Sequence, residues 1–257
     1  MNVALSRSIA GHVAIITGAA AGMGKATALL FAQEGAHVAV TDRDVAAAAS
    51  VVEEIAAAGG SACAWALDVA DVDRIQAVVD EVAARWGRLD IIVNNAGIGC
   101  MLPIDAPEYE AAWEALHSVL LRAQARMVRA ALAHLRQSAH PRVVNIGSTE
   151  ALGATSGNSV YAAAKAGITG LTRALAVELG RDGITVNCIC PGPILTEMTR
   201  HIPQEQRDVF ARRRTALRRY GRPEEVAHMT LGFCLPAASY VTGTTLAVDG
   251  GQSVRFA

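Results

Sequence analysis

The sequence has almost no net charge and no long apolar run. Its 23 Lys and Arg residues nearly balance 24 Asp and Glu residues, so the chain has no overall positive field for a polyanion and we expect no nucleic-acid partner. No segment reaches the roughly 18 uninterrupted apolar residues of a membrane-spanning helix, and no long apolar stretch precedes the first strand-like run. We therefore expect a soluble, cytoplasmic protein with no membrane partner.

Cysteine is scarce and its spacing is uninformative for metal binding. The five cysteines form no Cys-x-x-Cys pair, and most stand in apolar runs: Cys63, Cys100, Cys188, Cys190 and Cys234. This pattern is typical of buried thiols in a reducing compartment, so we expect no disulfide and no metal. Cys188 and Cys190 are two apart on an expected strand and should pack side by side in the core.

Short β-rich runs alternate with longer alanine-rich helical patterns, which is typical of βαβ units in a parallel α/β sheet. Several strands are apolar at consecutive positions, as expected where both faces of a doubly wound sheet are covered. Strands are expected at 12–17, 36–41, 63–67, 89–93, 142–147, 183–189 and 245–248. Helices are expected at 22–34, 44–58, 71–86, 108–137, 158–180 and 223–235.

The sequence predicts a single domain over 1–257, because 52% of its residues are apolar and no linker or internal repeat divides the chain. Its least regular stretch, 191–222, has the composition of an insertion over a site. Arginines crowd this stretch: Arg207, Arg212, Arg213, Arg214, Arg218, Arg219 and Arg222. They form either a solvated helix face or subunit contact, or a capture site for an anionic substrate such as a carboxylate, sulfonate or carrier-linked acyl group.

A glycine-rich turn follows the first expected strand and opens a helical pattern: Gly18, Gly22, Met23 and Gly24. Glycines at such a turn let the backbone approach a pyrophosphate, which would then sit at the positive end of the helix. An ordinary tight turn is the alternative.

Asp42 ends the second expected strand, 18 residues beyond Gly24. A carboxylate there can accept hydrogen bonds from both ribose hydroxyls of an adenosine and would repel a 2′-phosphate. Asp42 therefore favours NAD over NADP, although the neighbouring Arg43 leaves dual use open. Alternatively, Asp42 is only a solvated turn residue, or the guanidinium of Arg43 stacks on the adenine.

Tyr161 and Lys165 are four residues apart, which places them on one helical face about one turn apart. A free tyrosine, with a pKa of about 10, is a weak base near neutral pH, and a nearby cation favours its phenolate form. Ser148 precedes Tyr161 by 13 residues at the end of a strand and can hydrogen-bond a substrate oxygen. Taken without other motifs, such a tyrosine and lysine would more often form a surface pair.

The Gly-x-x-x-Gly-x-Gly spacing and further motifs resemble those of the classical short-chain dehydrogenase/reductase family over almost the whole chain. These motifs are Asp68-Val69, Asn94-Asn95-Ala96-Gly97, Ser148, Tyr161-x-x-x-Lys165, Pro191-Gly192-Pro193-Ile194 with Thr196, and Val248-Asp249-Gly250-Gly251. The resemblance implies a Rossmann-like, doubly wound, seven-stranded parallel sheet with helices on both faces. It also implies an oxidoreductase that uses a nicotinamide cofactor, for which Asp42 favours NAD, with tolerance of NADP as the lesser option.

The resemblance assigns Tyr161 as acid/base, Ser148 as ligand of the substrate oxygen, and Lys165 as both ribose ligand and stabiliser of the phenolate. It implies that the cofactor is held by Gly18, Gly22, Met23, Gly24, Asp42, Arg43, Asp68, Val69, Asn95, Ala96, Gly97, Tyr161, Lys165, Pro191, Gly192, Ile194 and Thr196. Asn94 and Asn95 could instead only cap the strand edge.

The Tyr-x-x-x-Lys spacing differs from that of the enoyl reductase branch, which favours a C–OH/C=O bond over C=C. Substrate contacts are expected from Ser148, Glu150, Asn158, Tyr161 and Met198, with mostly apolar neighbours at Ile98, Cys100, Met101, Leu102 and Leu195. A medium-sized secondary alcohol or ketone would suit such a pocket. A non-catalytic cofactor-binding sensor or scaffold of the same fold is the alternative.

Two further expectations concern the long helical patterns. Their apolar stripes include Val119, Met127, Leu132, Leu171 and Leu175, and the resemblance implies a homotetramer built by such helices. Leu120 occupies a position where the family carries an asparagine that holds a water near the lysine. Three consequences are open. Leu120 packs in the core while a backbone carbonyl holds the water, or His117 or Gln124 holds the water in place of the asparagine, or proton exchange is slower.

Overall fold

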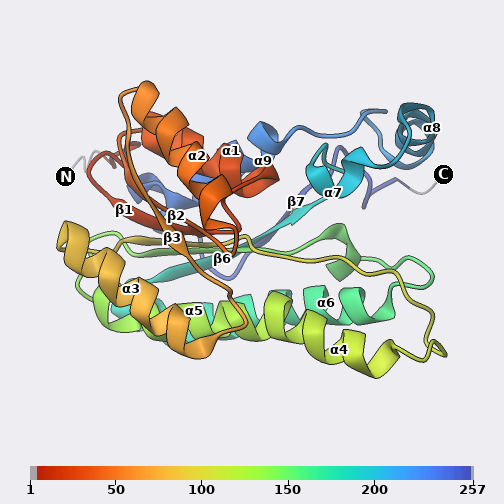
Figure 1. Ribbon diagram of the computed structural model, residues 1–257, viewed down its shortest axis with the longest axis horizontal. Helices are drawn as coiled ribbons and strands as arrows, with labels where there is room; N and C mark the ends of the chain where they lie inside the picture. Colours follow the sequence, from red (N-terminus) through yellow and green to blue (C-terminus); the bar gives the residue numbers. More distant parts are fainter. Residues whose placement is uncertain (1–4, 256–257) are drawn as a thin grey trace.

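The computed structural model describes residues 5–255, and they form one doubly wound domain around a parallel sheet (Figure 1). The strand order is β3-β2-β1-β4-β5-β6-β7, with every neighbouring pair parallel. The strands are β1 Val13–Thr17, β2 His37–Asp42, β3 Ser61–Ala66, β4 Ile91–Asn94, β5 Arg142–Ile146, β6 Thr185–Pro191 and β7 Thr245–Val248. The sequence prediction of seven strands is confirmed, with bounds shifted by at most two residues.

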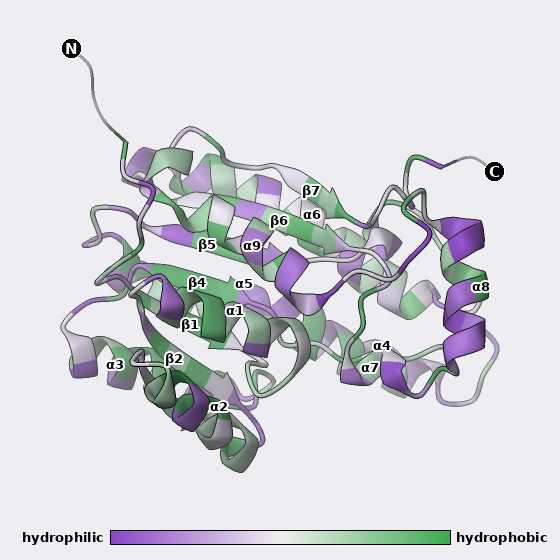
Figure 2. Ribbon diagram, turned by 90° about the horizontal axis from the view of Figure 1, so that it is seen from above, coloured by the Kyte–Doolittle hydropathy of each residue, from purple (hydrophilic) through white to green (hydrophobic). Residues whose placement is uncertain are grey.

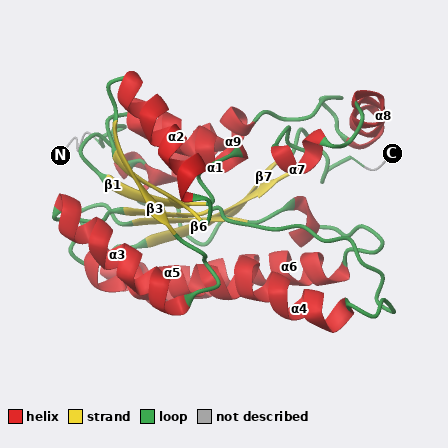
Figure 3. Cartoon of the chain, viewed as in Figure 1, coloured by secondary structure: helices red, strands yellow, loops and turns green. Residues whose placement is uncertain are grey.

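Helices cover both faces of this sheet (Figures 1 and 3). One face carries α1 Gly22–Gln33, α2 Val45–Ala57 and α9 Pro223–Cys234, and the other carries α3 Val72–Trp86, α4 Tyr109–His117, α5 Ala123–Leu135 and α6 Ser159–Leu179. Every residue of β1, β4, β5 and β6 is buried, and most of these residues are apolar, as expected where both faces of a sheet are covered (Figure 2). No helix in the described part of the chain is long and apolar enough to cross a membrane.

The single helix expected over 108–137 is interrupted in its middle. A π-helical turn, η1 Ser118–Arg122, joins α4 to α5. A π turn is wider than an α turn and changes which residues face the core. Here consecutive leucines both pack inward: Leu120 joins Val160 and Ala164, while Leu121 lies against Gly167 of α6. Residue periodicity alone does not distinguish this turn from a continuous helix.

The stretch 191–222 is more regular than predicted. It contains α7 Glu197–Arg200 and α8 Gln204–Arg214, which stand beyond the end of β7 in Figure 1. The sequence conceals α8 because only one of its residues, Ala211, is buried, so the helix has no apolar stripe. Three 3-10 turns complete the described chain: η2 Thr149–Ala151, η3 Gly180–Asp182 and η4 Pro236–Ala238.

Buried thiols lie behind the carboxyl end of β5. Cys188 and Cys190 share one face of β6, as predicted, with their sulfurs 3.9 Å apart. The hydrogen bond with Cys190 and burial raise the pKa of the Cys188 thiol. All five cysteines are free, and residues 5–255 contain no group of three or more potential ligands that could hold a metal ion.

Candidate active site

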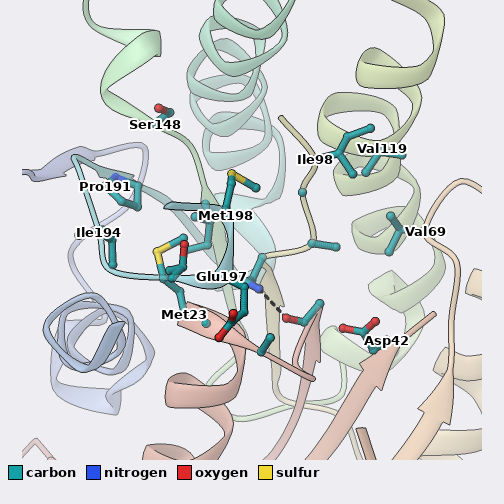
Figure 4. A pocket seen from close by; sticks show the side chains of 18 of the residues that line it. Met23, Asp42, Val69, Ile98, Val119, Ser148, Pro191, Ile194, Glu197 and Met198 are labelled. Atoms are coloured by element: carbon teal, nitrogen blue, oxygen red, sulfur yellow. Dashed lines mark hydrogen bonds between the residues drawn. The ribbon is translucent and has the colours of Figure 1, made fainter. Parts of the chain in front are cut away.

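A cavity of about 500 Å³ opens at the carboxyl ends of the central strands (Figure 4). Its walls come from the glycine turn after β1, the ends of β2, β4 and β5, two residues of α6, and the start of 191–222. In open α/β sheets this edge, near the point where the strand order reverses, is where ligands bind. Figure 4 shows Asp42 and Ser148 toward opposite ends of the cavity. An extended molecule can therefore contact both.

The glycine turn is shaped for close approach of an anion. Gly18 has a φ of +63°, a conformation that glycine adopts without steric cost. The N-terminus of α1 has no side-chain cap and no acidic residue in its first turn. Its first N–H groups are therefore available to an anionic ligand beside Gly22 and Met23, which line the cavity. These features fit a diphosphate.

Gly24 lies beneath the turn and does not line the cavity. A Cβ atom at this residue would stand only 2.2 Å from the carbonyl oxygen of Gly18 and 2.5 Å from Nδ2 of Asn95. Asn95 in turn donates to the carbonyl oxygens of Thr17 and Gly18, at 2.9 and 3.0 Å. The third glycine thus permits close packing under the turn.

The asparagines after β4 have different environments. Asn94 is buried and donates to Asn145, which donates to Thr172 of α6. Asn95 ties the glycine turn to β4 and also lines the cavity, so it combines the two roles left open by the sequence.

Asp42 faces the cavity from the end of β2. Its carboxylate accepts hydrogen bonds from the backbone N–H groups of Ala20, at 3.2 Å, and Asp44, at 3.1 Å. These bonds fix the carboxylate at the cavity wall, next to Arg43, and Asp68 and Val69 line the same region. The arrangement presents fixed acceptor oxygens where the expected adenosine ribose would lie.

Ser148, Tyr161 and Lys165 all line the opposite part of the cavity. Lys165 is only 4% exposed, and its Nζ donates to the carbonyl oxygen of Ile146 at 2.9 Å. The same nitrogen lies 5.5 Å from the centre of the Tyr161 ring. The side chain of Ser148 accepts from the N–H of Glu150 at 3.1 Å, which leaves its hydroxyl proton available to another acceptor.

Most of the other expected site residues line this cavity, with exceptions on the substrate side. Ala96, Gly97, Pro191, Gly192, Ile194, Thr196 and Met198 line it, as do Ile98, Val119, Ile146, Gly147, Glu197 and Thr199. The expected substrate-side residues that do not line it are Glu150, Asn158, Cys100, Met101, Leu102 and Leu195. The Glu150 carboxylate accepts from Oγ1 of Thr155, at 2.6 Å, and from the N–H of Thr155, at 3.0 Å. The Glu150 carboxylate therefore stabilises the loop between Glu150 and Thr155 and does not face the cavity.

Several lining residues were not expected from the sequence. Glu197 and Thr199 fall within the stretch read as irregular, and Val119 belongs to a helical pattern assigned to subunit contacts. Gly147 could have been anticipated, because it directly precedes Ser148 at the carboxyl end of β5.

Leu120 is fully buried and packs with Val160 and Ala164 of α6, close to Gly97. His117 is engaged elsewhere: its Nδ1 lies 2.9 Å from the carbonyl oxygen of Trp113, and the two rings stack. Both side-chain polar atoms of Gln124 are buried and have no hydrogen-bond partner among the described residues. These contacts favour the packing role for Leu120 and leave Gln124 as a candidate water ligand.

The arginines of 207–222 do not line the cavity. Arg219 pairs with both carboxylate oxygens of Glu225, at 2.6 and 2.7 Å. The hydrogen bonds from Arg219, and then from the N–H of Arg222, lower the pKa of Glu225 to about 2. Arg213 and Arg214 border a second, open hollow on α8, beside Val209 and Phe210.

The sequence matches known proteins over nearly its full length. Residues 18–253 match a family model described as enoyl-(acyl carrier protein) reductase. The chain is 38% identical over 250 residues to subunit BbsD of a (hydroxy(phenyl)methyl)succinyl-CoA dehydrogenase from Thauera aromatica, covering 96% of this chain and 98% of that protein. It is 39% identical over 242 residues to the 3-oxoacyl-(acyl-carrier-protein) reductase FabG of Thermotoga maritima, with 94% and 97% covered.

A solved structure is also similar. A 7α-hydroxysteroid dehydrogenase complexed with NADH and 7-oxo glycochenodeoxycholic acid matches with a TM-score of 0.92 and 34% identity, over 96% of each chain. Together with the doubly wound sheet and the cavity at its carboxyl edge, these matches identify an oxidoreductase of a kind that uses a nucleotide cofactor. The chain belongs to the classical short-chain dehydrogenase/reductase family.

Proposed function

We propose that the protein transfers a hydride between NAD(H) and a secondary alcohol or ketone. The observation that carries the proposal is that Ser148, Tyr161 and Lys165 line one cavity with the glycine turn. A bound nicotinamide supplies or accepts the hydride. The Tyr161 hydroxyl gives its proton to the carbonyl oxygen in reduction and takes the alcohol proton in oxidation.

Neighbouring residues orient the reacting groups. The Ser148 hydroxyl donates a hydrogen bond to the substrate oxygen, and the ammonium of Lys165, which lies 5.5 Å from the centre of the Tyr161 ring, binds the nicotinamide ribose. Asp42 binds the adenosine ribose, the turn at Gly18 and Gly22 holds the diphosphate, and Ile194 and Thr196 hold the carboxamide. Residues 191–222 are called the lid from here on, and their first part, up to Thr199, lines this site.

Steady-state assays with a panel of secondary alcohols and ketones, run with both NAD(H) and NADP(H), test the proposal. We expect turnover with NAD(H). Nucleotide binding without turnover of any member of the panel would favour the alternative, a cofactor-binding sensor or scaffold of the same fold.

The substrate is expected to be of medium size and largely apolar where it meets the reacting centre. Ile98, Val119 and Met198 line this region, and the lid arginines lie outside it. The named relatives act on a CoA thioester, a carrier-linked 3-oxoacyl group and a steroid. The names of these three relatives indicate a reaction at C–OH/C=O, in line with the Tyr161 to Lys165 spacing, whereas the matching family model carries the name of an enoyl reductase. The alternative of an anionic substrate is tested by comparing neutral and anionic members of the panel.

Asp42 is expected to set the preference for NAD. Replacing Asp42 by Ala should lower the ratio of kcat/KM for NAD to that for NADP by about tenfold or more, because a charged hydrogen-bonding group contributes about 1–3 kcal/mol. Asp42→Asn removes the charge but keeps one acceptor oxygen, so it can retain the hydrogen bond from only one of the N–H groups of Ala20 and Asp44, which bond to different carboxylate oxygens. Preference of the unmodified enzyme for NADP would contradict this role.

We further propose a homotetramer in the cytoplasm, with its five thiols kept reduced. Support from the long helices is weaker than the sequence indicated, because Met127 is core, Val119 lines the cavity, and Leu132 and Leu175 pack against the core. Val177 on α6 remains 85% exposed, and Tyr240 beside β7 is fully exposed. Light scattering at micromolar concentration should give four times the chain mass, and a monomeric mass would contradict the proposal.

A further inference from the structure

The segment 249–255, called the tail from here on, lies against both ends of the lid. Figures 1 and 2 show the C-terminal end of the chain beside α8. At the start of the lid, a Cβ atom on Gly192 would stand only 2.7 Å from Cα of Asp249. At its far end, Leu217 donates its N–H to the carbonyl oxygen of Gly250 at 3.0 Å. The tail therefore touches the two places where the lid joins the domain.

The tail has a defined shape of its own. The Asp249 carboxylate accepts from the N–H groups of Gly251, at 2.9 Å, and Ser253, at 2.7 Å. Burial opposes ionisation of this carboxyl, but these hydrogen bonds outweigh it and hold the pKa of Asp249 below its ordinary value. The turn is thus fixed at its first residue, and the rest of the tail runs toward α8.

Arg255 makes the contact at the end of the tail. Its Nη1 donates to the carbonyl oxygen of Arg212, at 2.9 Å, and to that of Thr215, at 2.8 Å. Both acceptors are at the C-terminal end of α8, where carbonyl groups lack partners within the helix. A cation there also complements the negative end of the helix dipole. Arg255 therefore caps the C-terminal end of α8 from a distant part of the chain.

The chain just beyond this contact is strained. Arg218 has a φ of +56°, the one positive value among non-glycine residues in the described part of the chain. This left-handed conformation costs an ordinary residue free energy, so neighbouring contacts must hold it. Leu217, bonded to Gly250, directly precedes it, and the fully buried Thr215 lies three residues before it. The tail therefore supports the bend that ends the lid.

The same bend is connected to the cavity wall. Gly221 and the start of the lid form a bridge, in which Leu195 donates to the carbonyl oxygen of Gly221 and Gly221 donates to that of Pro193, both at 2.9 Å. The residues on either side of Leu195, Ile194 and Thr196, line the cavity. A shift at the end of α8 is thus passed on to the wall of the proposed nicotinamide site.

We propose that Arg255 is a positioning residue that anchors the C-terminal end of α8 and thereby holds the lid over the nucleotide site. It touches neither cofactor nor substrate and acts through the carbonyl groups of Arg212 and Thr215. Its effect on nucleotide binding rests on the proposed function, whereas its effect on the lid does not.

Limited chymotrypsin digestion of the full chain without cofactor tests the anchor directly, because Phe210 and Tyr220 stand on either side of the contact. Arg255→Ala should raise the cleavage rate at these residues about three- to tenfold, since opening of the lid no longer breaks charged hydrogen bonds. Arg255→Lys, which keeps the cation, should fall between Arg255→Ala and the wild type. Arg212→Ala is the matched control, because it removes a cation from the same turn but keeps the accepting carbonyl, and it should digest like the wild type.

Fluorescence titration with NADH then measures the effect on the site. Arg255→Ala should bind NADH about three- to tenfold more weakly than Arg212→Ala, in proportion to its cleavage rate. Two digestion results would contradict the anchoring role of Arg255: a wild-type cleavage rate in Arg255→Ala, or equally fast cleavage in Arg212→Ala.

Two titration results concern the nucleotide site. Faster cleavage of Arg255→Ala with unchanged NADH affinity would contradict the connection between the lid and the site. A wild-type protein that binds no NADH would refute the proposed function, and the digestion would still test the anchoring role.

Discussion

Tyr161→Phe should lower kcat by at least about 100-fold, because a positioned acid/base group contributes roughly 10²- to 10⁴-fold to turnover. The substitution removes only the hydroxyl, so the ring stays in the cavity near Nζ of Lys165. NADH affinity should therefore stay within about threefold of the wild-type value, a change below about 1 kcal/mol. Initial rates at saturating NADH, together with a fluorescence titration, measure the two quantities.

Tyr109→Phe is the matched control for this experiment. The Tyr109 hydroxyl lies 2.9 Å from Oγ of Ser159, two residues before Tyr161 on the same helix, but it does not line the cavity. Its loss should change kcat by less than about threefold, or about 0.7 kcal/mol of barrier, because this exposed hydrogen bond lies outside the cavity. Undiminished turnover in Tyr161→Phe would mean that another group moves the proton.

Gly24→Ala should impair both folding stability and nucleotide binding. The added methyl group would lie 2.2 Å from the Gly18 carbonyl oxygen and 2.5 Å from Nδ2 of Asn95. Neither atom can retreat easily, because Asn95 is bonded to the carbonyl oxygens of both Thr17 and Gly18. We expect the free energy of unfolding to fall by about 1–3 kcal/mol, the cost of overpacking a close-packed site. NADH affinity should fall about tenfold or more, because the turn that would hold the diphosphate must shift.

Gly232→Ala provides the contrast within a helix. Among the described residues, no atom outside its chain neighbours and the backbone of its own helix turn lies within 4 Å of the position that its Cβ would take on α9, so the substitution should stabilise the protein by up to about 1 kcal/mol. Urea denaturation and NADH titration of both variants separate the steric effect from the general effect of adding a methyl group. Equal behaviour of the two variants would refute the close packing assigned to Gly24.

Sequence predicted those features whose physical cause is local. The buried strands are apolar at consecutive positions, the glycine turn follows directly on β1, and Tyr161 and Lys165 share a helical face by spacing alone. Each of these requirements can be recognised within a few neighbouring residues. The family resemblance then joined them into one site, and the cavity contains most of the residues that it implied.

Other features depend on contacts between distant segments and could not be predicted in this way. The π turn at Leu120 and Leu121 is matched to Gly97 and Gly167, which come from other elements. The polar helix α8 has a cap from Arg255, 43 residues beyond Arg212. Glu150 looked available to a substrate, but its carboxylate is bonded to Thr155. A run of arginines likewise does not reveal that Arg219 is paired with Glu225.

The position of the tail bears on how the protein should be tagged or immobilised. A group attached to the chain beyond Arg255 would leave the domain next to α8, so its bulk would lie beside the lid. The N-terminal end of the chain emerges at the opposite side of the molecule (Figure 1). Attachment through the N-terminus is therefore the better choice for kinetic work, and enzyme fixed to a surface through its C-terminus should show altered nucleotide exchange.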